Sequence, residues 1–151
     1  MFKRMWSPAS GRPTRDPLDS EIAIRVFGYR WVEWNHGLLR GAPLETPGRF
    51  LASPDHPLAH LHVDAAPGTE PAPDALTLVP PFTTSLDRAF DAAQKVGLFG
   101  GGYACLRRTA EGDWSIETAS GGLRVAGPRL APTVCRAAIA WLDRSNHEEN
   151  P

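Results

Sequence analysis

Two stretches of this sequence carry its clearest structural signal: Pro80-Pro81-Phe82-Thr83-Thr84-Ser85-Leu86-Asp87-Arg88-Ala89-Phe90-Asp91-Ala92-Ala93 and Leu130-Ala131-Pro132-Thr133-Val134-Cys135-Arg136-Ala137-Ala138-Ile139-Ala140-Trp141. Each opens with proline, continues with a hydroxyl residue and then becomes rich in alanine. Proline suits the first turn of a helix, and a hydroxyl oxygen accepts a hydrogen bond from a free first-turn amide. Both stretches therefore predict amphipathic helices.

The spacing of apolar residues predicts which face of each helix is buried. In the helix that begins near Ser85 and stops at Gly97, the apolar face comprises Leu86, Ala89, Phe90, Ala93 and Val96. A last helix is predicted over 132–143, and its buried side comprises Val134, Ala138, Trp141 and Leu142.

Strand-like sequence lies between these two helices. Residues 103–108 and 114–118 predict a hairpin with its turn at 110–113, and 123–125 predict a short third strand. Gly100, Gly101 and Gly102 form a connector between helix and hairpin and lack the pattern of a nucleotide-binding loop.

The N-terminal part of the pattern begins with a helix over 17–27, capped by Asp16 and ended by Gly28. Residues 29–34 follow as a short strand or an aromatic turn. The periodicity thus changes from helical to two-residue alternation and back. This predicts an α/β (α+β) fold, a layered helix–sheet–helix sandwich with an antiparallel sheet.

Residues 41–81 interrupt this pattern, because they hold nine of the fifteen prolines of the chain. Proline blocks helix and removes an amide donor, so this span predicts loop with short extended pieces at 50–51 and 60–63. We interpret 16–144 as one domain with this proline-rich insertion. A basic tail at 1–15 and a fraying tail at 145–151 flank the domain.

The bulk composition favours a soluble, intracellular protein. The chain has 151 residues, a formal net charge of −1 and two cysteines, Cys105 and Cys135. No apolar run approaches the roughly 20 residues of a membrane span. We expect no membrane contact and no cofactor. The near-zero net charge gives nucleic acid no global attraction, so we do not expect nucleic acid as a partner.

Three short motifs resemble the phage ABA sandwich family of small phage and prophage proteins. The matching residues are Arg25–Tyr29, Pro81–Thr84 and Ala131–Ala138. The resemblance leaves out the first 15 residues and most of 35–78, where this chain has an enlarged proline-rich segment. It implies a helix–sheet–helix layered fold in a phage-encoded protein, and it implies no established activity.

The candidate ligand site is the predicted helix start at Thr83, Thr84 and Ser85. Free amides and hydroxyls at a helix N-terminus suit a phosphate, although helix capping explains the same residues. We expect an arginine to add a charge-assisted contact and an aromatic ring to stack on a base. The arginine candidates are Arg88, Arg107 and Arg108, and the aromatic candidates are Tyr29 and Trp31.

A histidine cluster is the second candidate site. If residues 60–64 are extended, then His60, His62 and Asp64 lie on one side at a period of two. Two imidazoles and a carboxylate form a zinc ligand set, which His56 or His36 completes. The cluster lies in proline-rich loop, so we expect no bound transition metal.

Three functions remain open at this point, and a non-enzymatic role is favoured because no recognisable catalytic set is present. The first is a small phage accessory protein that binds a phosphorylated small molecule or sequesters a signalling nucleotide, thereby inhibiting a host defence. The second is a protein–protein interaction or homo-oligomeric module without a small ligand. The third is a zinc-dependent enzyme that uses His56, His60 and His62.

Overall fold

The computed structural model describes residues 16–34, 48–65, 79–100, 104–119 and 122–149. It is an α+β protein with antiparallel sheets, as the sequence predicts. The elements follow in this order: α1 (Pro17–Arg25), β1 (Arg30–Trp34), β2 (Gly48–Ala52), a 3-10 turn (Ala59–Leu61), α2 (Leu86–Val96), β3 (Ala104–Arg108), β4 (Trp114–Thr118), β5 (Arg124–Gly127) and α3 (Leu130–Glu149).

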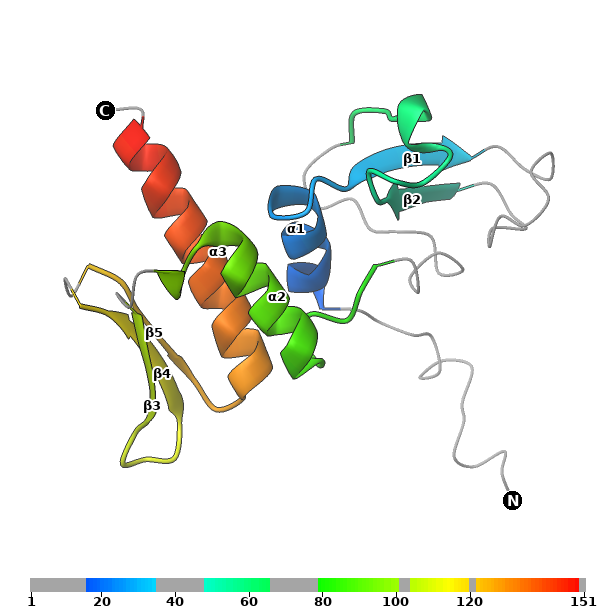
Figure 1. Cartoon of the computed structure of the whole chain (residues 1–151). Helices are drawn as coiled ribbons and strands as arrows, with labels where there is room; N and C mark the ends of the chain where they lie inside the picture. The colour runs from blue at the N-terminus through cyan, green and yellow to red at the C-terminus, as the bar shows by residue number, and fades with distance from the viewer. Residues whose placement is uncertain (1–15, 35–47, 66–78, 101–103, 120–121, 150–151) are drawn as a thin grey trace, which may run out of the picture.

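The elements are arranged in layers around α3 (Figure 1). The three-stranded sheet β3–β4–β5 lies on one side of the α2–α3 pair. Helix α1 and the β1–β2 hairpin lie on the other side. The core therefore forms between the inner face of the sheet, the two central helices and α1.

Helix α1 has the ends that the sequence predicts. The Asp16 carboxylate accepts a hydrogen bond from the Leu18 amide at 2.9 Å, and Pro17 occupies the first helical position. Gly28 has a φ of 74°, which an L-residue rarely adopts, and it lets the Tyr29 amide donate to Ala23 O at 2.9 Å. This closure turns the chain directly into β1.

Strand β1 pairs with β2, which lies in the first half of the proline-rich segment. Val32 lies opposite Phe50 in the register, and both side chains are fully buried. The pairing starts at Gly48 and thus extends the predicted 50–51 piece to five residues. Residues 66–78 of the same segment, which include most of its acidic and proline-rich second half, lie outside the described residues.

The predicted hairpin and third strand were confirmed. Strands β3 and β4 pair antiparallel with Leu106 opposite Ile116, and β5 adds Val125 opposite Ile116. These three side chains share one face of the sheet, and Ile116 at the centre is 0% exposed. Gly112, with a φ of 89°, makes the turn between β3 and β4 possible.

Helix α2 begins and ends where predicted, with Ser85 as N-cap and Gly97 as a left-handed C-cap at φ 79°. The predicted burial of Leu86 is wrong, because this side chain is 44% exposed. Ala92 is fully buried in its place, so the core-facing side of α2 is rotated toward the alanines. Small side chains there let α2 approach α3 closely.

Helix α3 is longer and more deeply buried than the sequence predicts. It spans Leu130–Glu149, so residues 145–149 continue the helix instead of fraying. Trp141 is only partly buried. Its first three turns are enclosed by the sheet, α2 and α1, and the buried side chains there are Thr133, Val134, Cys135, Ala137, Ala138 and Ile139.

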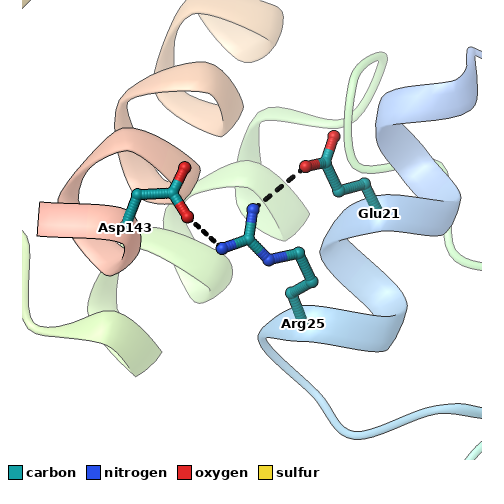
Figure 2. Close-up of polar contacts among 3 residues, drawn as sticks. All are labelled: Glu21, Arg25 and Asp143. Atoms are coloured by element: carbon teal, nitrogen blue, oxygen red, sulfur yellow. Dashed lines mark hydrogen bonds and ion pairs between the residues drawn. The ribbon is translucent and has the colours of Figure 1, made fainter. Parts of the chain in front are cut away.

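An arginine links α1 to the middle of α3 (Figure 2). The Arg25 guanidinium donates to the Glu21 carboxylate at 3.1 Å and also forms an ion pair with Asp143, a residue 118 positions away. The hydrogen bond to Asp143 is the main reason that the pKa of Arg25 is raised above its ordinary value. This ion pair thus joins α1, near the start of the described chain, to α3, near its end, on the protein surface.

Candidate functional site

The start of α2 forms a capped, surface-exposed helix terminus. Ser85 Oγ accepts a hydrogen bond from the Arg88 amide at 3.4 Å, which is the capping contact that its sequence position predicts. The Thr84 side chain and the Arg88 side chain are exposed. The amides of Leu86 and Asp87 have no acceptor among the described residues, as is usual for the first amides of a helix.

Thr83 belongs to the core and not to this exposed surface. It is 3% exposed, and its amide donates to the carboxylate of Asp19 at 2.8 Å. Asp19 lies in the first turn of α1 and is itself 2% exposed. The sequence gives no sign of this contact, because the two residues are 64 positions apart and an acid in a first helical turn is ordinary.

Tyr29 lies within electrostatic reach of the α2 start. Burial raises the pKa of the Tyr29 phenol, and the positive charge of Arg88 acts in the opposite direction. The structure therefore brings Tyr29 and Arg88 into one neighbourhood. Nearby, the rings of Phe27 and Phe82 stack with centroids 5.3 Å apart, which fixes the chain leaving α1 against the chain entering α2.

Arg107 does not join this group, and Trp31 makes no cation–π contact with Arg88 within the described residues. Trp31 packs against the core from β1, and its carbonyl accepts a hydrogen bond from the Val63 amide at 2.8 Å. Arg107 lies on β3, across the α2–α3 pair from β1, and forms a 3.1 Å ion pair with Glu117 (Figure 1). Arg108 stacks over the Trp114 ring at 5.2 Å on the same hairpin.

The predicted geometry of the histidine cluster is wrong. Residues 59–61 form a 3-10 turn, so His60 and His62 do not alternate along an extended strand. Proline and loop sequence at 53–58 favour this compact turn. His56 Nδ1 accepts a hydrogen bond from the Leu58 amide at 3.1 Å, and its ring packs edge-on against Phe50.

No group of three or more potential metal ligands occurs within the part of the chain that the structure describes. His36 lies outside that part, and Asp64 is an exposed residue beyond the turn.

Cys135 is held at the junction of the two central helices. Its thiol donates to the Phe82 carbonyl at 3.4 Å, and burial raises its pKa to about 12. The carboxylates of Asp19 and Asp16 add to this rise, because negative charge opposes formation of a thiolate. Cys135 is therefore a structural thiol and not a nucleophile.

We expect a thiol reagent at pH 8 to label exposed Cys105 in the native protein and to label Cys135 only after unfolding. Because folding raises the Cys135 pKa from 9.0 to about 12, this thiol favours the folded state fully below pH 9. That contribution falls between pH 9 and pH 12. Counting labelled thiols by mass spectrometry with and without denaturant tests the assignment, and rapid labelling of both thiols in the native protein would contradict it.

A half-open groove of about 410 Å³ lies at the other end of α2. The rings of Phe90 and Phe99 meet there at 5.8 Å. The groove carries no charged side chain, so it does not provide a phosphate contact. Its lining comprises Phe90, Gln94, Gly97, Phe99 and Gly100.

Within the described ranges, every helix is too short or too polar to cross a bilayer. Comparison of the chain with protein-family models, with curated proteins and with solved structures gave no match. The resemblance to the phage ABA sandwich family therefore remains a prediction from the sequence motifs.

Proposed function

We propose that this protein acts by binding a phosphorylated small molecule at the start of α2. The observation that supports the proposal most is the exposed start of α2, where the Leu86 and Asp87 amides have no acceptor among the described residues and the exposed Arg88 side chain adds a positive charge. The amides of Leu86 and Asp87 supply hydrogen-bond donors, and Arg88 supplies a charge. The exposed Thr84 hydroxyl donates weakly to Pro81 O at 3.5 Å and would exchange this contact for one to the phosphate. Thr83 has no part in the proposed site, since its amide already binds Asp19.

The electrostatics of this surface favour one phosphate group over a larger anion. The helix terminus contributes about half a positive charge, and Arg88 contributes one more. Asp87 in the first turn, buried Asp19 and Asp55, whose negative charge acts on Tyr29, oppose them. The attraction is therefore local, and we expect a ligand that also uses its base or sugar for contact, as a nucleotide does.

The motif resemblance supports a biological setting for this binding. In a phage-encoded protein of the bacterial cytoplasm, a site for one nucleotide would sequester a host signalling nucleotide and so inhibit a defence that depends on it. Sequestration requires no turnover, and the hydroxyl of Ser85 serves as a helix cap instead of a nucleophile.

Thermal unfolding with a panel of mono-, di- and cyclic nucleotides tests the proposed function. A ligand at 100 times its Kd adds about 2.7 kcal/mol to the free energy of unfolding, which raises the melting temperature by several degrees. We expect Thr84→Ala combined with Arg88→Gln to abolish the shift.

The control is Arg124→Gln, because Arg124 is equally exposed but lies on β5. It should leave the ligand-induced shift unchanged. A shift that survives in the Thr84–Arg88 double variant would place the ligand elsewhere, and the absence of a shift with any nucleotide would favour the interaction-module function.

A further inference from the structure

A row of cationic and aromatic side chains crosses one end of the three-stranded sheet and continues onto α3. We call Arg108, Trp114, Arg136 and Arg129 the arginine row. At this end, the β3–β4 turn and the β5–α3 connection lie next to each other (Figure 1). The sequence did not reveal the row, because its members come from three separate segments.

The row is continuous by contact from Arg108 to Arg136. Arg108 lies opposite Trp114 in the register, with its guanidinium 5.2 Å from the ring centroid. Trp114 lies opposite Gly127 on β5. The guanidinium of Arg136 covers Gly127, since a Cβ atom there would lie 2.1 Å from Arg136 Nη2.

Two hydrogen bonds hold Arg136 in this position. Its Nη2 donates to Ala126 O and to Thr133 Oγ1, each at 3.3 Å. Thr133 Oγ1 in turn donates to the backbone carbonyl of Arg129 at 2.6 Å, so the Arg129 backbone lies at the same turn and its exposed side chain extends from there. Adjacent strands are about 4.8 Å apart, so the stretch from Arg108 to Gly127 alone spans about 10 Å.

The three arginines of the row are exposed and carry uncompensated charge. No carboxylate of the described residues lies within ion-pair distance of Arg108, Arg129 or Arg136. By contrast, Arg107 on the same hairpin is neutralised by Glu117. The row is thus a local cationic surface on a chain whose formal net charge is −1.

We propose that the arginine row binds single-stranded nucleic acid. Three separated guanidinium groups match successive phosphates better than they match one compact anion, and guanidinium forks bind phosphate in a bidentate manner. The Arg108–Trp114 pair offers a flat surface on which a base can stack, an interaction that tolerates any sequence. A protein of this net charge has no long-range attraction for nucleic acid, so binding depends on this row alone.

Fluorescence anisotropy with a labelled 15-nucleotide thymidine oligomer, measured at several salt concentrations, tests the proposal. For single strands each phosphate contact contributes about 0.7 to the slope of log K against log salt, so three contacts predict a slope of roughly −2. Arg136→Gln should weaken binding and reduce the slope by about 0.7. Arg124→Gln, which removes an exposed arginine outside the row, should change neither quantity.

Gly127→Ala provides a sharper variant, because it removes no charge. The new methyl group would displace the Arg136 guanidinium from its place beside the sheet, and it would also lie 2.8 Å from Oγ1 of buried Thr133, which holds that guanidinium. We expect this variant to weaken oligomer binding as Arg136→Gln does, while its circular dichroism spectrum stays that of the parent protein.

Several outcomes would overturn the proposal. They are absence of binding at low salt, a slope that Arg136→Gln leaves unchanged, and equal affinity for a polyglutamate peptide of the same charge. The proposal stands apart from the nucleotide site on α2: Thr84→Ala combined with Arg88→Gln should keep oligomer binding, and Arg136→Gln should keep the nucleotide-induced thermal shift.

Discussion

Replacing Ile116 by alanine is expected to lower the free energy of unfolding by about 3–4 kcal/mol. Ile116 is fully buried at the centre of the middle strand, between Leu106 and Val125 on the neighbouring strands. It belongs to the core cluster that joins the sheet to the central helices. Truncation removes apolar contacts and leaves a cavity that packed strands and helices cannot fill. Urea denaturation of the parent and the variant measures the difference.

Ile24→Ala is the matched control, because it makes the same chemical change on the outer face of α1, where the side chain is 37% exposed. Its effect should stay below about 1 kcal/mol. If the two alanine variants were equally stable, the sheet would not contribute its inner face to the core as described.

Replacing Asp19 by alanine is expected to cost about 2–3 kcal/mol. The change leaves the Thr83 amide without its acceptor in a buried position just before α2. A buried donor that has lost its partner costs its full desolvation free energy, whereas making the bond contributes only about 1 kcal/mol. We also expect the segment that enters α2 to become more mobile, because Asp19 connects it to the first turn of α1.

Asp19→Asn distinguishes the hydrogen bond from the charge. The asparagine carbonyl can still accept from the Thr83 amide, so we expect this variant to lose less stability than Asp19→Ala. Hydrogen exchange of the Thr83 amide provides a second measurement, and it should be faster in the alanine variant alone. Equal losses in both variants would mean that the negative charge, and not the hydrogen bond, stabilises the contact.

The sequence predicts the local structure of this protein well wherever that structure depends on interactions between residues a few positions apart. The caps at Asp16 and Ser85, the stops at Gly28 and Gly97, and the β3–β4 hairpin were all confirmed. Each depends on a side chain that accepts a hydrogen bond from a nearby amide, or on a glycine that adopts a φ value rare for other residues. The end of α3 was predicted too early, because polar residues there resemble a fraying tail when packing is ignored.

Burial and the composition of the site depended on contacts that sequence spacing does not contain. Leu86 fits the apolar stripe of α2, yet it is exposed, because the side of α2 that packs against the core contains Ala92 instead. Tyr29 and Arg88 are 59 positions apart, and only the fold brings them close enough to interact. The histidine prediction failed for a different reason: it assumed extended backbone in a segment that turns.

The central position of α3 also determines when the protein can fold. The helix follows α1, α2 and all five strands in the order of synthesis, yet it is the surface on which the sheet and the other helices pack. A ribosome adds about 5–20 residues per second. Until α3 is synthesised, the nascent chain therefore carries Ile22, Ile116 and the α2 alanines without the helix that covers them. We expect the core of this domain to form as one unit after synthesis of α3.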